Sequence, residues 1–446
     1  MSQSSLPNLP EPVEPPARPP TTPAVARVRR AVRNQMEWVE RDLDSLVPEE
    51  HPVRAIWGLL ESMELSAFYA HIKALLDRPG QPASDPQVLL ALWVYATIDG
   101  VGKARALDRL CRAHDAYRWL RGGVPVNYHL LADFRVAHQA ALNELLTDIV
   151  GCLMHAGAVT LGQVAQDGMR VRASAGAASF RRQDTLEACL KEAKAQVERL
   201  AQERERPDPG VTKRQQAARQ RAAREREERV AKALEYLPQV QAAKERQQRT
   251  LATGKRVKVT APRTSTTDPE TRVMKMPDGG FRPAYNVELA TDATHGVIVG
   301  VAVTAEGTDA GQAVPMARQV ERRTGQQPGN YLMDGGFATR DDITTLERQG
   351  ITVYAPVRLP RNKAEEERYQ PRQGDSPEVV RWRRRMATEE AKTIYRARGA
   401  TAEWANARVR ALGVSQFTVR GLPKVTTVML LVAVAHNLLR WLALET

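Results

Sequence analysis

The sequence predicts an all-helical N-terminal part followed by an α/β part with a mixed sheet, which a helical hairpin interrupts. Between residues 43 and 156 the apolar residues recur at helical spacing. From residue 157 to 446, short apolar runs of strand length alternate with helical segments, the order typical of a sheet covered by helices. Residues 181–251 interrupt that order with a charged stretch near heptad spacing, which predicts an exposed antiparallel pair of helices.

Composition and charge limit the possible functions. The apolar share of 42% is enough for a core, and the longest apolar run, residues 428–435, is too short to span a bilayer. No apolar leader opens the chain and its three cysteines lie far apart, so we expect a cytoplasmic protein with no membrane partner. Lys and Arg outnumber Asp and Glu by 65 to 52, and the net charge of +13 favours a nucleic-acid partner. A merely basic soluble protein is the alternative.

The N-terminal part divides into a lead and a helical module. Residues 1–42 are rich in Pro and Ser and end in a basic run, so we expect a disordered basic lead. In residues 43–156, Asp85 before Pro86 is typical of a helix start, and Asn127 is a second candidate cap. The module has possible helix-turn-helix content, and six of its arginines could face a DNA duplex: Arg105, Arg109, Arg112, Arg118, Arg121 and Arg135. We take three of them as the candidate DNA contacts: Arg105, Arg109 and Arg135. An ordinary bundle with solvated arginines is the alternative reading.

Two acidic residues lie in predicted strands of the second part. Asp167 falls within a strand pattern over residues 159–173, where an Asp is disfavoured and needs a reason. Asp334 ends a short apolar strand and precedes a Gly-Gly turn, a helix near 339–349 and another strand near 351–354. This βαβ order places Asp334 at the carboxyl end of a strand, where open α/β sheets carry their chemistry.

A third acid, Glu403, lies on a late helix, and Asn406 and Arg410 share its face. Carboxylates that converge from separate elements hold two hard divalent cations, Mg²⁺ or Mn²⁺, through oxygen ligands. Two such ions flank a phosphodiester in an in-line displacement. Four other acids compete for these roles: Asp292, Asp309, Glu389 and Glu390.

Several sequence blocks resemble the signature blocks of bacterial insertion-sequence DDE transposases that have an N-terminal helical transposase domain. The blocks are residues 162–173 (GQVAQDGMRVRA), 331–337 (YLMDGGF), 395–403 (YRARGATAE) and 420–437 (RGLPKVTTVMLLVAVAHN). Residues 51–54 and 133–135 resemble blocks of the N-terminal domain. The similarity extends from about Leu46 to Leu442, and the order of the blocks makes it specific.

The resemblance implies a ribonuclease H-like catalytic domain over residues 157–446. It implies metal-dependent cleavage of double-stranded DNA at the terminal inverted repeats of an insertion sequence, with strand transfer into target DNA. It further implies a bacterial protein associated with the nucleoid, which acts as a homodimer when it holds a pair of ends. The resemblance assigns the metal-binding, catalytic triad as Asp167, Asp334 and Glu403.

Further DNA contacts follow from the same resemblance. Tyr395 and Arg398 match a Tyr…Arg lead-in to the glutamate, where such residues handle DNA. Arg408 or Arg410 stands where the family often has a lysine, and Arg keeps the charge and can bind phosphate with two hydrogen bonds.

Two other functions remain open from the sequence. One is a structure-specific, metal-dependent DNA nuclease of the same fold, which would cleave without joining strands. The other is a non-catalytic DNA-binding descendant of a transposase, and the presence of all three acids argues against it.

Overall fold

The computed structural model describes residues 40–70, 72–74, 81–205, 211–250, 260–359 and 364–445. Nearly all of the predicted disordered lead and the expected helix break at 207–210 lie outside these ranges. Leu43–Thr446 forms one compact unit. The boundary between 156 and 157 and the limits 181–251 of the insertion stay predictions.

The N-terminal part is helical, as predicted. Its helices are α1 (Pro52–Glu61), α2 (Ser66–Tyr69), α3 (Pro86–Ile98), α4 (Ala104–Ala113), α5 (Asp115–Arg121), α6 (Tyr128–Ala137) and α7 (Gln139–His155). Both predicted caps are present. Asp85 Oδ1 accepts a hydrogen bond from the Gln87 N–H at 2.9 Å, and Asn127 Oδ1 accepts from two N–H groups at the start of α6.

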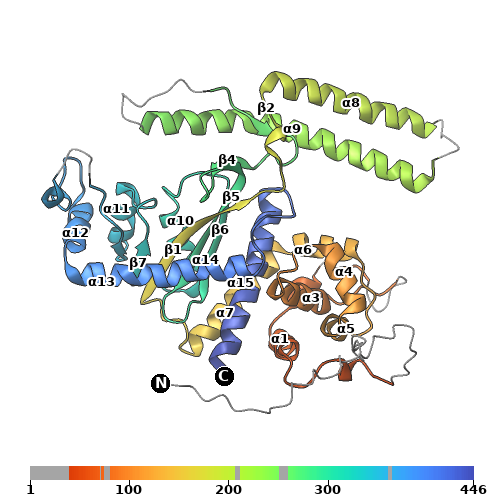
Figure 1. Cartoon of the computed structure of the whole chain (residues 1–446), viewed down its shortest axis with the longest axis horizontal. Helices are drawn as coiled ribbons and strands as arrows, with labels where there is room; N and C mark the ends of the chain where they lie inside the picture. The colour runs from red at the N-terminus through yellow and green to blue at the C-terminus, as the bar shows by residue number, and fades with distance from the viewer. Residues whose placement is uncertain are drawn as a thin grey trace, which may run out of the picture. The chain divides into compact units, whose positions relative to one another are not determined.

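A mixed six-stranded sheet follows (Figure 1). It contains β1 (Gln163–Arg172), β4 (Arg272–Lys275), β5 (Phe281–Asp292), β6 (Ile298–Thr304), β7 (Asn330–Met333) and β8 (Thr352–Tyr354). The order is β4-β5-β1-β7-β8, and β6 also pairs with β5. Alternating apolar residues over 285–289 and 297–303, on either side of a turn at 292–296, predict a β-hairpin, and this hairpin is the antiparallel pair β5–β6. The predicted βαβ unit is the parallel pair β7–β8 with α11 (Arg340–Arg348) between them. This sheet is consistent with the predicted ribonuclease H-like domain.

Helices complete the second part: α10 (Ala313–Thr324), α12 (Pro377–Met386), α13 (Glu389–Arg398), a π-helix (Gly399–Glu403), α14 (Trp404–Ala411) and α15 (Leu422–Glu445). The sequence did not predict α12, because residues 358–385 form a stretch dominated by basic and polar residues. Its start signal is nevertheless visible: Ser376 caps the helix and Pro377 occupies its first turn, the same pattern as Asp85 and Pro86. The strand β4 and the short pair β2 (Phe180–Arg181) and β3 (Thr264–Ser265) were also missed.

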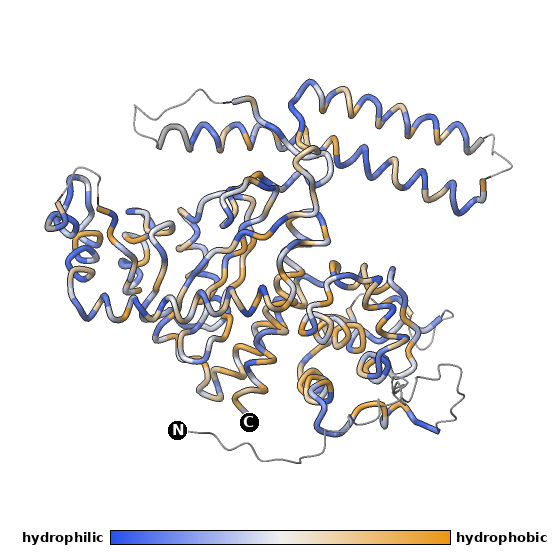
Figure 2. The backbone as a smooth tube through the Cα atoms, viewed as in Figure 1, coloured by the Kyte–Doolittle hydropathy of each residue, from blue (hydrophilic) through white to orange (hydrophobic). Residues whose placement is uncertain are grey.

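The closing helix α15 joins the two parts of the core. It contacts α3, α6 and α7 of the helical part and β6 of the sheet, within one continuous hydrophobic core. Figure 2 shows the apolar character of α15. The helical stretch Leu422–Leu444 extends beyond the apolar run 428–435 and, by length and composition alone, is long and apolar enough to cross a membrane, but 61% of its most apolar window is buried inside the protein. The stretch is therefore a core helix.

Side chains bond backbone groups on the open sides of two edge strands of the sheet, β6 and β8. On β6, the Gln319 amide donates to the Val301 carbonyl and accepts from its N–H, at 3.0 and 2.7 Å. Asn437 of α15 does the same for Ile298, with both distances 2.9 Å. On β8, Glu347 accepts from the Val353 N–H at 2.9 Å, and Arg385, which is paired with Glu347, donates to the Val353 carbonyl at 2.9 Å.

The insertion forms an antiparallel helical pair, as predicted: α8 (Gln183–Glu205) and α9 (Lys213–Thr250) lie side by side in Figure 1. A small apolar cluster, Leu186, Val230, Ala233 and Leu237, holds the start of α8 against the middle of α9. The same middle part of α9 is tied to the loop before β4. Glu270 in that loop accepts hydrogen bonds from Lys232 and Tyr236 at 3.0 and 2.9 Å.

We expect Gly296→Ala to destabilise the fold more than Gly325→Ala. Both glycines have a φ of +70°, so alanine costs roughly 1–2 kcal/mol of backbone strain at either site. A Cβ at Gly296 would lie 2.5 Å from Trp404 Cζ3, whereas a Cβ at Gly325 would have no atom within 4 Å. The crowding adds roughly 1–3 kcal/mol. Urea unfolding measures the difference, and equal losses at the two sites would contradict it.

Candidate active site

Asp167 and Asp334 lie side by side at the centre of the sheet. The strands β1 and β7 are parallel, and their last paired residues are Gln166 and Met333. Asp167 and Asp334 are the next residue on each strand, so their side chains leave the same face of the sheet. The structure thus brings together two of the three acids that the sequence singled out.

Three donors surround the Asp167 carboxylate. Oδ1 accepts from the Gly168 N–H at 3.0 Å and from the Arg398 guanidinium at 2.9 Å, while Oδ2 accepts from the Asn406 amide at 2.9 Å. Burial raises the pKa of Asp167, and the neighbouring Asp334 and Asp309 raise it further, whereas Arg398 and the Gly168 N–H lower it. The three donors therefore fix the position of the Asp167 carboxyl group.

A tight turn fixes Asp334. Its Oδ1 accepts a short hydrogen bond from the Gly336 N–H. A Cβ at Gly336 would lie 2.8 Å from Asp334 Oδ1 and 3.0 Å from Asp309 Oδ2. Glycine at this position therefore allows a second acid, Asp309, to approach Asp334.

A second group of polar side chains lies around Gly168, and the sequence reading missed it. A Cβ at Gly168 would lie 3.0–3.2 Å from oxygens of Glu288, Asn286 and Asp309. Asn286 links the group, donating to Glu288 at 2.7 Å and to Asp309 at 2.8 Å. Burial, with Asp309 as the next cause, raises the pKa of Glu288 to about 8. The available signal was the polar positions of β5, Asn286 and Glu288, in a strand that is buried almost throughout.

Glu403 lies at the end of the π-helix, which packs against β1 and β5. Its side chain is exposed and has no hydrogen bond or ion pair with any described residue. Within the described ranges, no three His, Cys, Asp or Glu side chains are grouped closely enough to hold a metal ion. π-Helical turns are frequent at functional sites, where one extra residue redirects the side chains of a helix.

The other residues of this segment lie on either side of the π-helix. Tyr395 is half-buried on α13; burial raises its pKa, and Asp334 and Asp167 contribute to the rise. Arg408 and Arg410 are exposed on α14. The Arg408 guanidinium lies 6.0 Å from the centre of the Trp404 ring.

The three arginines predicted to face a duplex do not behave alike. Arg105 and Arg109 are exposed one turn apart on α4. Arg135 is only 8% exposed: it donates to the Gly102 carbonyl, and its guanidinium lies over the Trp93 ring at 4.6 Å. Arg135 therefore packs inside the helical part and does not offer its guanidinium to a duplex in this structure.

Several competing residues have structural roles. Asp292 accepts from the N–H groups of Leu161 and Thr294 at 2.9 Å each, which fixes the turn between β5 and β6. Glu389 pairs with Lys392 on the exposed start of α13. His436 is buried and hydrogen-bonded to the Gly296 carbonyl at 2.9 Å. Trp404 packs edge-on against His436.

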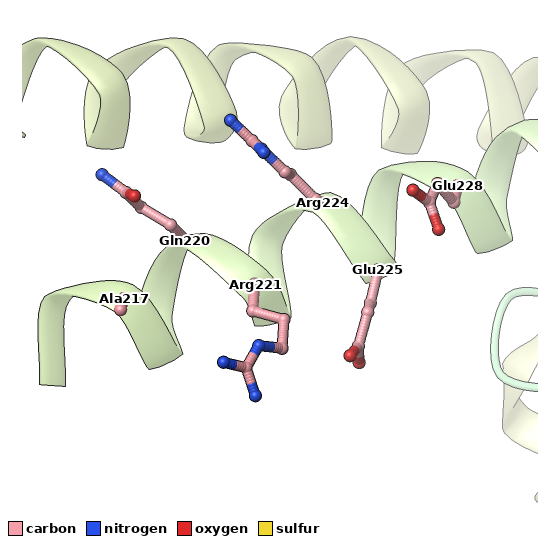
Figure 3. Close-up of a pocket in the computed structure, with 6 residues that line it drawn as sticks. All are labelled: Ala217, Gln220, Arg221, Arg224, Glu225 and Glu228. Atoms are coloured by element: carbon pink, nitrogen blue, oxygen red, sulfur yellow. The ribbon is translucent and has the colours of Figure 1, made fainter. Parts of the chain in front are cut away.

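A shallow hollow on the helical pair α8–α9 is separate from Asp167 and Asp334. Its lining residues all belong to α9: Ala217, Gln220, Arg221, Arg224, Glu225 and Glu228. Figure 3 shows Gln220 and Arg224 directed towards the neighbouring helix, and Arg221 and Glu225 directed away from it. Gln220 donates to the Leu200 carbonyl of α8 at 2.9 Å. The hollow thus lies along α9 and holds no arrangement of catalytic side chains.

Comparison with protein families gives two matches. Residues 41–137 match a transposase domain (DUF772), and residues 258–438 match a transposase DDE domain. This chain is a DDE transposase. The DDE-domain match includes Asp334 and Glu403 but begins after Asp167. Asp167 lies on β1, and β1 pairs in parallel with β7, which is inside the matched residues. No curated protein and no solved structure matched the transposase.

The DDE transposase family uses divalent metal ions. The oxygen atoms at this site are of the kind that binds such ions. The acids offer only carboxylate oxygens, which suit hard cations such as Mg²⁺. Among the described ranges the buried Asn406 Oδ1 has no hydrogen-bond partner, so a further oxygen is available beside Asp167. Oxygens without nitrogen or sulfur donors favour Mg²⁺ or Mn²⁺ over Zn²⁺.

We expect His436 to make the stability of the transposase pH-dependent. Burial lowers its pKa from 6.5 to about 4, so the folded state favours the neutral ring. Above pH 6.5 the neutral ring leaves the free energy of unfolding at its full value. As the pH falls from 6.5 towards 4, the unfolded chain binds a proton at His436 and the folded protein does not, so the free energy of unfolding falls by on the order of 3 kcal/mol. Urea unfolding of wild type and His436→Asn should give stabilities that converge as the pH falls over this range. Parallel curves would contradict the assignment.

Proposed function

We propose that this transposase cleaves double-stranded DNA at the terminal inverted repeats of an insertion sequence and transfers the strands into target DNA. The observation that carries the proposal is the pair Asp167 and Asp334 at matching positions of two parallel strands, next to the segment that carries Arg398 and Glu403. We assign Asp167, Asp334 and Glu403 as the residues that hold two divalent cations, Mg²⁺ or Mn²⁺.

The roles of the residues follow from their charges and positions. When bound, the two cations supply an activated oxygen nucleophile and stabilise the leaving oxygen of the phosphodiester. Asp167 and Asp334 provide fixed negative charge on one face of the sheet. Glu403 is exposed on the π-helix, so its side chain can turn towards the acids without breaking an existing contact.

Basic and aromatic side chains around the acids are suited to DNA. Arg398 carries a positive charge at the acids, where it can meet a phosphate, and Tyr395 lies beside it on α13. Arg408 and Arg410 extend the charge along α14, and Arg105 and Arg109 offer a second basic position on α4. We propose that the protein acts in the bacterial cytoplasm, at the nucleoid, as a homodimer that holds a pair of ends.

We expect Asp167→Ala, Asp334→Ala and Glu403→Ala each to lower cleavage of end-containing DNA by roughly 10³-fold or more, because each removes a ligand for a cation that stabilises the transition state. DNA binding should remain, since these acids repel phosphates. Cleavage with Mg²⁺ and gel-shift binding measure the two effects. The matched control is Glu390→Ala, on the exposed first turn of α13, which should cleave at the wild-type rate.

A strand-transfer assay separates transposition from simple nuclease activity. A transposase joins the cleaved 3′-hydroxyl to target DNA, whereas a structure-specific nuclease of the same fold releases cleaved ends only. Cleaved but never joined DNA would favour the nuclease.

We expect the double variant Arg105→Gln, Arg109→Gln to lower the salt dependence of DNA binding. Each phosphate contact contributes about 0.9 to the slope of log K against log salt concentration, so the double variant should lose about 2. Fluorescence anisotropy at several salt concentrations measures the slope. Arg118, which pairs with Asp115 at 2.9 Å, provides the control, and Arg118→Gln should keep the wild-type slope.

A further inference from the structure

Asp167 has no free carboxylate oxygen in this structure. Arg398 and the Gly168 N–H share Oδ1, and Asn406 holds Oδ2. A divalent cation can bind Asp167 only if it adds to, or replaces, one of these donors. One side-chain donor precedes the π-helix and the other follows it along the chain: Arg398 is the last residue of α13, and Asn406 lies within α14.

The two donors differ in how firmly they are held. Asn406 is 5% exposed on a short side chain, and the hydrogen bond to Asp167 is the only one that its amide nitrogen makes with a described residue. Its Oδ1 is buried and accepts no hydrogen bond from the residues that the structure describes, which normally costs free energy. An acceptor oxygen therefore lies beside the Asp167 carboxylate.

Arg398 is held by its charge. Its guanidinium meets Asp167 at 2.9 Å with the Arg398 and Asp167 side chains 11% and 18% exposed, and its Nε has no partner. A guanidinium and a metal ion compete for the same carboxylate, because each neutralises the same negative charge. An arginine side chain is long enough to leave Asp167 while its helix stays in place.

We propose that Asn406 is a positioning residue that fixes the Asp167 carboxylate, and that Arg398 is the cation that Asp167 exchanges for a divalent metal ion. The inference rests on the proposed function, since it takes Asp167 as a metal ligand. Without metal, Arg398 neutralises Asp167. With a metal ion bound, Asn406 would keep Asp167 in place through Oδ2, Oδ1 would be a ligand for the ion, and Arg398 would be available to a DNA phosphate.

If Asp167 exchanges Arg398 for a metal ion, Asn406→Leu and Arg398→Gln should change the metal affinity in opposite directions. Asn406→Leu removes the donor that orients a ligand, and loss of such a partner typically weakens metal binding by about 10- to 100-fold. Arg398→Gln removes the competing charge, so the affinity should rise by about tenfold, the lower limit for a charge-assisted hydrogen bond. A general loss of structure would weaken binding in both variants.

The experiment titrates full-length protein with Mn²⁺ in the absence of DNA and follows free Mn²⁺ by electron paramagnetic resonance. Thermal unfolding in EDTA first checks that each variant is folded. If Asn406→Leu does not fold, Asn406→Ser takes its place, because serine is too short to reach Asp167 and adds no apolar surface. Arg396→Gln is the matched control: Arg396 is exposed on the same helix and lies 4.0 Å from Glu389, and its loss should leave the affinity unchanged.

The outcomes separate this inference from the proposed function. Wild-type affinity in the Asn406 variant, or an Arg398→Gln affinity no tighter than wild type, would overturn the exchange. If Asp167→Asn removes cleavage and Mn²⁺ binding while the Asn406 and Arg398 variants bind as wild type, only the inference fails. If Asp167→Asn still cleaves, or wild type shows no Mn²⁺ binding that depends on Asp167, the assignment of Asp167 fails with it.

Discussion

The structure depends on placing two carboxylates next to each other in the middle of a sheet. Parallel pairing of β1 and β7 sets Asp167 beside Asp334, and no side-chain movement can separate their strands. Like charges at this spacing repel and favour protonation unless donors or cations offset them. The features around the pair meet that need: the N–H groups of Gly168 and Gly336, the Arg398 guanidinium and the Asn406 amide.

The helical segment from α13 to α14 carries the other candidate site residues: Arg398, Glu403 and Asn406. A continuous α-helix would keep residues 398 and 406 about 80° apart around its axis, since each residue advances by about 100°. The π-helix between them changes that angle, and both side chains reach the same carboxylate. Glu403, at the end of the π-helix, is left exposed. The irregular turn thus brings two different groups, Arg398 and Asn406, to the Asp167 carboxylate, while Glu403 stays exposed.

The sequence predicted those elements whose signals are local. Helix caps, the β5–β6 hairpin and the βαβ unit depend on neighbouring residues, and they appear where expected. It did not reveal Glu288 or Asn406 as neighbours of the acids, because those contacts depend on which face of each element is buried. Arg135 illustrates the same limit: it lies four residues after the fully buried Leu131, so helical spacing placed it on a face without saying that the face was inward. The assignment of Glu403 remains a prediction.

The side chains that bond the edge strands β6 and β8 have a consequence for how copies of this protein associate. An open strand edge offers its backbone to any other strand, and this leads to fused sheets and fibres. Here Gln319 and Asn437 occupy the outer backbone groups of β6, and Glu347 with Arg385 occupies those of β8. Two copies therefore cannot merge their sheets at these positions without breaking those bonds. Polar amides and an ion pair thereby protect a concentrated or crowded preparation from strand-by-strand aggregation at these sites.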